Sequence, residues 1–282
     1  MGLFIEYNPM DLFYIVWNPA PELIDWGFFT LRWYGFFWAL SLLFIDTMGG
    51  KICQWEGVPN KTTSLLAYSF IGGIIGARLA EVVFYNPAHF LLHPEEIVMI
   101  WNGGLASHGG VVGSILGIYL FHLRNKSFPF VWLLDRSAIL IIFAAGLIRL
   151  GNLFNSELVG YPTDLPWAFI FSNVDQIPRH PTPLYEAIAY ILLFIVVFAL
   201  YRRNSKRPTG TFMGLFLVLT FGIRFLIEFT KASETILIEA GNISLTQVLS
   251  LPMIAGGIIV LLMAQKGYFD GNVTATSPPP ST

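Results

Sequence analysis

The sequence predicts an all-α, polytopic membrane protein with about seven transmembrane helices. Of the 282 residues, 55% are apolar and only 12% are charged, against roughly 25% charged residues in an average soluble domain. A soluble protein of this length could not bury so much apolar surface. The apolar residues also gather in seven runs, each close to the roughly 20 residues that cross a bilayer core. These runs are residues 27–46, 63–85, 105–123, 131–151, 184–201, 212–230 and 246–264.

The runs divide the chain into one transmembrane domain with two flanking segments. Residues 1–26 are aromatic and acidic and lack the basic region that opens a signal peptide, so we expect an uncleaved segment at the membrane interface. Residues 27–265 should form the seven-helix domain, and the Ser/Pro/Thr-rich end of residues 266–282 indicates a disordered tail. The long loop 161–183 is either a surface connector or a lid over a site. Its stretch 167–171 is aromatic and is expected at the membrane interface.

The loop charges predict the orientation of the chain. Cytoplasmic loops of membrane proteins carry an excess of lysine and arginine. Here one set of loops holds most of the basic residues, and the opposite set is acidic. The N-terminus should therefore lie outside and the C-terminus in the cytoplasm. The basic set is Lys51, Lys61, Arg124, Lys126, Arg136, Arg202, Arg203, Lys206 and Arg207, with Lys266 beyond the last run.

This topology places the other basic groups at one depth, near the outer leaflet. Arg78, Arg149 and Arg224 lie toward the outward ends of the second, fourth and sixth runs. Arg32 and His108 open the first and third runs. We expect no matching cluster of charge in the inner half of the membrane. Polar groups at membrane depth are costly and usually mark a functional site.

The stretch from Gly146 to Gly160 is the most polar of these sites. If the helix continues through it, Arg149, Asn152 and Ser156 share one face, with Gly160 close behind. That face offers a fixed cation and amide donors with little bulk. It suits a phosphate or a carboxylate held at a membrane surface.

Two further motifs have competing interpretations. His108 follows a glycine-containing loop at a predicted helix start, where free N–H groups favour an anion; a structural, hydrogen-bonded histidine is the alternative. Arg224 and Glu228 are four residues apart, so they could form a self-neutralising ion pair instead of a binding site. Arg78 and Glu81 pose the same question. Arg179 could be a head-group anchor.

The glycines around His108 have a simpler explanation. Gly109, Gly113 and Gly117 form a small-residue ladder, and Gly72 and Gly76 begin a second one. Such ladders are typical of closely packed membrane helices.

Several function classes lack their motifs. The net charge of −2 gives no indication of a nucleic-acid partner. The single cysteine, Cys53, excludes an internal disulfide and is expected to be an inert thiol. There is no His-Glu-x-x-His, no Cys/His metal spacing, no phosphate-binding P-loop and no Gly-x-Ser-x-Gly elbow. We therefore expect no metal and no cofactor, and the chain lacks an activated nucleophile of its own.

Six blocks of residues resemble one known family. They occur in the order found in the bacterial phosphatidylglycerol–prolipoprotein diacylglyceryl transferases, and the resemblance covers about residues 25–265. The blocks are Arg32-Trp-Tyr34-Gly35, Gly76-Ala-Arg78, His108-Gly-Gly-x-x-Gly113, Arg149-x-Gly-Asn152-x-x-Asn155-x-Glu157-x-x-Gly160, Arg179-His-Pro-x-x-Leu-Tyr185-Glu186 and Arg224-x-x-x-Glu228.

The resemblance implies a seven-span enzyme of the bacterial inner membrane with its active site toward the periplasm. It implies transfer of diacylglyceryl from phosphatidylglycerol to the lipobox cysteine of a prolipoprotein signal peptide, with release of glycerol 1-phosphate. One departure is Thr220-Phe221, where the family is expected to have a tyrosine. The implied catalytic residues are His108, Arg149, Arg224 and Glu157. The implied lipid-binding residues are Arg149, Asn152, Arg224, Tyr34, Arg78, Gly160, Asn155 and Glu228.

The residues fit this chemistry. The substrate supplies the nucleophile, and a departing phosphate needs cations where charge develops. Arginine suits it through bidentate geometry, and His108 is the natural candidate for the base. A transporter would use a midplane site between repeats, and an intramembrane protease would need its own catalytic centre. A lipid-binding scaffold without catalysis is harder to exclude.

Overall fold

The computed structural model describes residues 14–204, 207–232, 236–238 and 243–269. The expectations for residues 1–13, for Lys206 and for most of the tail lie outside this part of the chain. Seven long helices make up the described part. They are α1 (Trp33–Glu56), α2 (Thr62–Ala80), α4 (Ser107–Arg124), α5 (Phe130–Phe154), α6 (Thr182–Arg203), α7 (Thr211–Ile227) and α8 (Leu245–Gln265).

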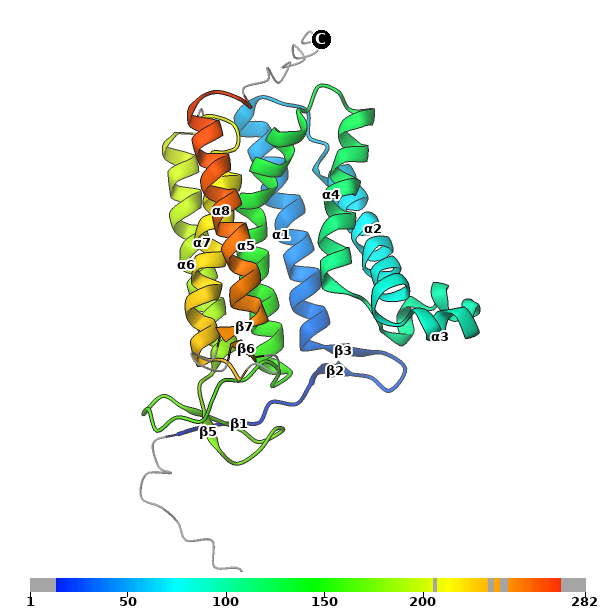
Figure 1. Ribbon diagram of the computed structural model, residues 1–282, viewed down its shortest axis with the longest axis vertical. Helices are drawn as coiled ribbons and strands as arrows, with labels where there is room; N and C mark the ends of the chain where they lie inside the picture. Colours follow the sequence, from blue (N-terminus) through cyan, green and yellow to red (C-terminus); the bar gives the residue numbers. More distant parts are fainter. Residues whose placement is uncertain (1–13, 205–206, 233–235, 239–242, 270–282) are drawn as a thin grey trace, which may run out of the picture.

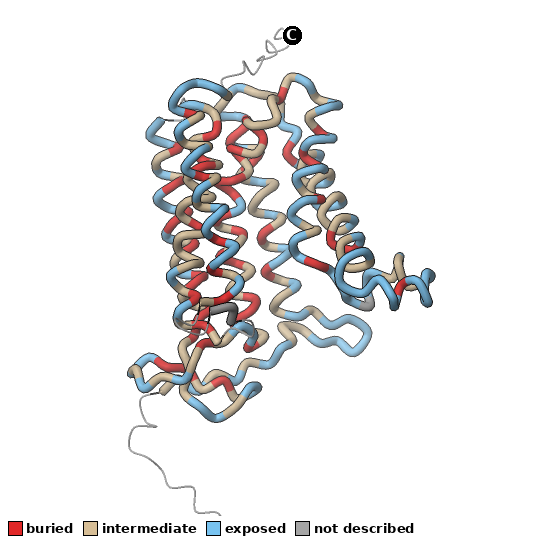
Figure 2. The backbone as a smooth tube through the Cα atoms, in the orientation of Figure 1, coloured by how far each residue is buried: buried red, intermediate tan, exposed pale blue. Residues whose placement is uncertain are grey.

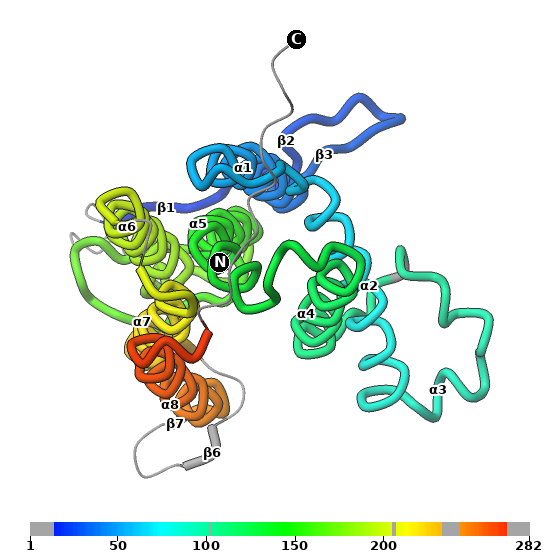
Figure 3. Tube along the Cα trace, turned by 90° about the horizontal axis from the view of Figure 1, so that it is seen from above, coloured from blue at the N-terminus to red at the C-terminus, as the bar shows by residue number. Residues whose placement is uncertain are grey.

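The long helices run side by side and alternate in direction (Figure 1). Helix α5 lies in the middle and contacts α1, α4, α6 and α7 (Figure 3). It is also the most buried of the long apolar helices (Figure 2). In its most apolar 18-residue stretch, 61% of the residues are buried, against 11% in the corresponding stretch of α2. The bundle core forms where α5 meets α6 and α7, through Ile139, Ile142, Val197, Tyr201 and Phe212. Polar side chains on the buried faces of α5 are therefore packed against other helices.

Six of the described helices are long and apolar enough to cross a membrane. They are α1, α2 with the π-helical turn η2 (Glu81–Tyr85), α5, α6, α7 with the 3₁₀ turn η5 (Glu228–Thr230), and α8. The seventh expected run forms α4, which is not among the six. Its 18 residues include two histidines and an arginine, which make it less apolar.

Helices α2 and α4 pack through their glycines, as the ladders predict. A Cβ atom added at Gly72 would lie 2.4 Å from the carbonyl oxygen of Gly113, and one at Gly117 would lie 2.1 Å from that of Tyr68. Both distances are too short for a side chain. The prediction that these glycines serve close helix packing is confirmed.

The first helix differs from its predicted range of residues 27–46. Residues 22–32 form a hairpin of β2 (Glu22–Asp25) and β3 (Thr30–Arg32), and α1 then runs on to Glu56. The turn at Gly27 has φ +79°, a left-handed conformation that glycine adopts easily. At the other end Gly49 continues the helix, because it packs against Thr62 of α2. Lys51, expected in a loop, consequently lies within α1.

The loop 161–183 contributes to a small sheet at one end of the bundle (Figure 1). Strand β4 (Phe169–Phe171) pairs with β1 (Ile15–Trp17) on one side and with β5 (Pro178–Arg179) on the other. Phe169 and Phe171 are buried against Leu153 and Trp17. These phenylalanines are covered by protein, whereas Trp167 is exposed; the position of the stretch at the membrane interface stays a prediction. We call this end, where α5 finishes, the sheet end.

The remaining elements also lie near the sheet end. A short arm between α2 and α4 projects from the bundle (Figures 1 and 3). It consists of α3 (Pro87–Leu92), η3 (Pro94–Val98) and η4 (Ile100–Asn102), and the pair β6 (Ile236–Ile238) and β7 (Ile243–Ser244) precedes α8.

The opposite end of the bundle contains a buried charge cluster, so the expectation that none exists there is wrong. Arg136 does not lie in a loop but on α5, 2.6 Å from Glu56 and 2.5 Å from Asp135. Asp135 is fully buried and accepts the backbone N–H of Met213 at 2.8 Å, near the start of α7. Arg136 compensates part of the charge of the two carboxylates, and these contacts connect α1, α5 and α7. Such internal pairing is the usual condition of buried ions.

Candidate functional site

The end of α5 has an unusual backbone. The helix finishes at Phe154, and both Ser156 (φ +54°) and Leu158 (φ +56°) are left-handed although neither is glycine. Such conformations cost energy in non-glycine residues and are frequent at functional sites. They turn Glu157 back toward the helix, where its N–H donates to the carbonyl of Asn152 at 2.9 Å. The helix therefore does not continue through this stretch, and Ser156 does not share a helical face with Arg149.

Side chains from α5, α6 and this turn form one connected series. The Arg149 Nε atom lies 3.0 Å from the Glu186 carboxylate, and Arg149 Nη1 donates to Asn152 Oδ1 at 3.2 Å. Asn152 Nδ2 donates to one oxygen of Glu157 at 2.8 Å, and Asn155 Nδ2 donates to the other at 3.1 Å. We call these five residues the Arg149 chain. Each contact fixes the next side chain, so the arginine is held from two sides.

Arg224 on α7 brings a second arginine with a different environment. Within the part of the chain that the structure describes, its guanidinium makes no hydrogen bond or ion pair. Glu228, its predicted alternative partner, instead accepts the Ser244 hydroxyl at 2.9 Å and lies 3.9 Å from Lys231 Nζ. The expected Arg224–Glu228 ion pair does not form. The cation of Arg224 is thus available to a ligand.

Lys231 shows that the two arginines belong to one electrostatic environment. Its ammonium group is buried, and burial lowers its pKa. The carboxylates of Glu186 and Glu228 oppose this change, while the charges of Arg149 and Arg224 add to it. The same four charges act on the phenol of Tyr190 on α6. Helices α5, α6 and α7 therefore gather these groups at the sheet end.

Tyr34 packs against Gly151, next to the Arg149 chain, and Gly160 packs against the segments before α6 and after α7. A Cβ atom added at Gly151, the residue before Asn152, would lie 2.9 Å from the Tyr34 ring. A Cβ atom at Gly160 would lie 2.5 Å from His180 Cβ and from the Thr230 carbonyl oxygen. Glycine at position 160 is therefore needed for the close approach of three segments.

Arg179 is used within the protein. Its guanidinium binds both carboxylate oxygens of Asp175, at 2.5–3.1 Å, and donates to the Gly160 carbonyl at 3.2 Å. The hydrogen bond from Arg179 lowers the pKa of Asp175. These contacts indicate that Arg179 stabilises the conformation of the loop. They do not support a role as a head-group anchor.

His108 is not hydrogen-bonded to the Arg149 chain among the described residues. It is exposed in the first turn of α4, and its Nδ1 atom is 3.4 Å from the Tyr85 hydroxyl. Among the described residues no hydrogen bond joins it to Arg149, Asn152 or Glu157. The prediction that His108 lies at a helix start is confirmed. The contact with Tyr85 was not predicted.

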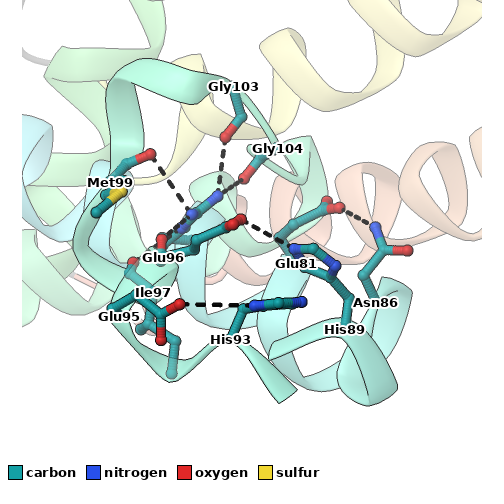
Figure 4. Close-up of polar contacts among 11 residues, drawn as sticks. Glu81, Asn86, His89, His93, Glu95, Glu96, Ile97, Met99, Gly103 and Gly104 are labelled. Atoms are coloured by element: carbon teal, nitrogen blue, oxygen red, sulfur yellow. Dashed lines mark hydrogen bonds and ion pairs between the residues drawn. The ribbon is translucent and has the colours of Figure 1, made fainter. Parts of the chain in front are cut away.

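Arg78 is enclosed by the segment that leads to His108. The guanidinium is 6% exposed and donates only to backbone carbonyls. Figure 4 shows the carbonyl oxygens of Met99, Gly103 and Gly104 directed at the guanidinium. The acceptors are Glu96, Ile97 (2.9 Å), Met99 (3.5 Å), Gly103 (2.8 Å) and Gly104 (3.0 Å).

These contacts change the interpretation of Arg78. All of its donor atoms are used by the protein, so a phosphate would have to displace a carbonyl. Glu81, the predicted alternative partner, instead accepts the side-chain amide of Asn86 at 2.6 Å (Figure 4). Arg78 is well placed to shape the loop before α4.

The sequence analysis did not include Glu186 or Lys231 among the site residues. Both are charged residues at the edge of an apolar run, which was the available signal. No group of three or more His, Cys, Asp or Glu among the described residues is arranged to hold a metal ion.

Comparison with known proteins identifies one family. Residues 21–263 match the family model described as prolipoprotein diacylglyceryl transferase. The chain is 42% identical over 254 residues to a protein of Tolumonas auensis, an alignment that covers 89% of this chain and 98% of the relative. It is 41% identical to one of Chloroherpeton thalassium, covering 90% and 95%, and 38% identical to one of Porphyromonas gingivalis, also covering 90% and 95%. All three relatives are named phosphatidylglycerol–prolipoprotein diacylglyceryl transferase.

Proposed function

This chain belongs to the prolipoprotein diacylglyceryl transferase family, and we propose that it performs the family's reaction through the Arg149 chain and Arg224. The diacylglyceryl group of phosphatidylglycerol moves to the cysteine thiol of a prolipoprotein. The sulfur–carbon bond forms as the carbon–oxygen bond to the phosphate breaks. The thiol proton goes to a base, and glycerol 1-phosphate leaves with the electron pair.

The observation that best supports this assignment is the pair of differently held arginines. Arg149 is fixed by Glu186 and Asn152, while Arg224 has no hydrogen-bond or ion-pair partner among the described residues. Together they suit a phosphodiester whose negative charge increases as the bond to carbon breaks. Preorganised donors stabilise such developing charge without further rearrangement. Arginine also matches phosphate with paired N–H donors.

The base is proposed to be His108. The substrate thiol attacks as the thiolate, and a free thiol has a pKa of about 8.5. His108 is exposed at a helix start and contacts only the Tyr85 hydroxyl among the described side chains. Glu157 is the alternative base. Its two oxygens already accept N–H groups from Asn152 and Asn155, so both oxygens are engaged before the thiol arrives.

The other implied residues take supporting roles in this proposal. Asn152 and Asn155 orient Glu157, and Tyr34, which packs against Gly151, is proposed to contact the lipid. Glu228 orders the turn after α7 through Ser244 and Lys231. Gly160 allows close packing. Arg78 shapes the loop before His108, because its guanidinium donates to backbone carbonyls of that loop.

We propose seven spans, with α4 as the third, because α4 runs alongside α2 in the same alternating order (Figure 1). The N-terminus and the sheet end then face the periplasm, and the C-terminus faces the cytoplasm of a bacterial inner membrane. This topology follows the excess of lysine and arginine in the opposite loops.

Reporter fusions test the topology. Fusions after Arg207 and after Lys266 should both give a cytoplasmic signal. Both positions lie at the end of the bundle that carries the basic loops. A fusion after Asn173, in the loop between α5 and α6, is the matched control and should read periplasmic. A periplasmic signal at Arg207 or Lys266 would refute the assigned orientation.

The single cysteine provides a second test. Cys53 is buried near the end of α1 opposite the sheet end, 3.7 Å from the Thr62 hydroxyl (Figure 1). Cys53→Ser should leave the turnover within about twofold of wild type, because the substrate supplies the nucleophile. A loss of a hundredfold in a folded variant would show that the protein itself provides a covalent nucleophile.

Labelled lipid tests the function directly. Purified protein in detergent with head-group-labelled phosphatidylglycerol should release glycerol phosphate only when a lipobox peptide with a free cysteine is present. The same peptide with serine at that position is the control. Release without peptide would indicate a lipase, and binding without release would indicate a lipid-binding scaffold.

A further inference from the structure

Helix α6 presents a buried polar stripe to the site. Thr182, Glu186 and Tyr190 lie at intervals of four residues, which places them on one helical face. Their exposed fractions are 0%, 1% and 2%. A buried carboxylate is costly unless a cation compensates it. For Glu186 that cation is Arg149, whose Nε atom lies 3.0 Å from Glu186 Oε2.

Glu186 restricts the orientation of the Arg149 guanidinium. A guanidinium has five N–H groups in one plane. Glu186 lies at Nε, and Asn152 accepts from Nη1 at 3.2 Å. Glu186 on α6 pairs with the guanidinium by charge, without a hydrogen bond to its Oε2 atom, and Asn152 on α5 accepts a hydrogen bond, so the group is held from two sides. The N–H groups left on Nη1 and Nη2 have no partner in the described part of the chain, and they are neighbours that can bind two phosphate oxygens together.

We propose that Glu186 is a positioning residue for the transfer reaction. It holds Arg149 so that its free N–H edge is set for the phosphate before the substrate arrives, and it does not itself touch the lipid. This inference rests on the proposed function, because it assigns Arg149 to the departing phosphate. A group fixed before the reaction stabilises the transition state most, and a misplacement of about 1 Å can cost roughly 10²-fold in rate.

A positioning role differs from a purely structural ion pair in what it changes. A structural pair contributes to stability, so its loss lowers the melting temperature and leaves kcat of the folded protein unchanged. A positioning residue acts through Arg149, so its loss lowers kcat and has little effect once Arg149 is gone.

The test is Glu186→Gln, which keeps the shape and an acceptor oxygen but removes the charge. We expect kcat for glycerol phosphate release to fall by about 10- to 100-fold, with the lipid KM within about threefold of wild type. Glu56→Gln, which removes the carboxylate partner of Arg136 at the opposite end of the bundle, is the matched control and should keep kcat within about twofold of wild type. In an Arg149→Lys background, Glu186→Gln should cost less than about threefold, because lysine has no Nε–H to be oriented.

Wild-type kcat in Glu186→Gln would overturn the inference, as would an equal loss in the wild-type and Arg149→Lys backgrounds. Glu186→Asp serves if the glutamine variant does not fold. Its shorter side chain should not reach Arg149, so a normal kcat for that variant would also overturn the inference. These outcomes leave the proposed function intact. A wild-type protein that releases no glycerol phosphate in the presence of the cysteine peptide would instead refute the proposed function and this inference together.

Discussion

Arg149→Ala is expected to lower the turnover of diacylglyceryl transfer by about 10²–10³-fold or more, the cost of losing a preorganised donor to developing charge. Alanine removes the guanidinium and also leaves the buried Glu186 carboxylate without its partner at 3.0 Å. Arg149→Lys should recover little of the rate, because an ammonium lacks the paired N–H edge. The loss should appear mainly in kcat, since the contact strengthens as the phosphate departs.

The measurement is kcat and lipid KM for purified variants that remain folded at the assay temperature. Arg124→Ala is the matched control, because Arg124 lies at the opposite end of the bundle and donates to the Tyr68 hydroxyl at 2.8 Å. It should leave kcat within about twofold. Near wild-type kcat in folded Arg149→Lys would remove the requirement for a guanidinium at this position.

His108→Gln and His108→Ala are both expected to lower turnover by about 10²–10⁴-fold, the usual contribution of a general base. Glutamine can donate and accept hydrogen bonds but cannot take up the thiol proton. Raising the pH should restore part of the rate in both variants, because it produces substrate thiolate without a base. The pH profile of turnover at saturating lipid provides the measurement.

His93→Gln is the matched control for the histidine variants. His93 lies on the exposed arm, 3.5 Å from Glu95, with no described contact to His108 or Arg149. Its turnover should match wild type at every pH. If His108→Gln works nearly as well as histidine, the base must be Glu157 or the thiolate must form in the field of Arg149 and Arg224, and His108 would only orient the head group.

The long helices could be predicted from the sequence because apolar runs of bilayer length have few alternatives. Helix ends were less predictable. Gly49 and Lys51 looked like a loop, yet α1 continues through them because Gly49 packs against Thr62 of another helix. Arg136 also looked like a loop residue, but it lies on α5 between Glu56 and Asp135. Contacts between distant segments decide such positions, and local composition does not reveal them.

The site was predictable in its residues and less so in its connections. Arg149, Asn152, Asn155 and Glu157 were named from one stretch, and the structure joins them in one hydrogen-bonded series. The left-handed turn around Glu157 was not predictable, because its flanking residues are serine and leucine. Pairing also escaped sequence reasoning, which could not show that Arg149 contacts Glu186 of α6 or that Arg224 and Glu228 fail to pair.

The most direct test of the account is a double-mutant cycle on glycerol phosphate release, with wild type, Arg149→Gln, Arg224→Gln and the double variant. Both arginines are proposed to hold one phosphate, so each single variant should lose most of the turnover. The double variant should lose far less than the product of the two single losses. Losses that multiply, or a single variant that keeps wild-type turnover, would contradict a shared phosphate site at the sheet end.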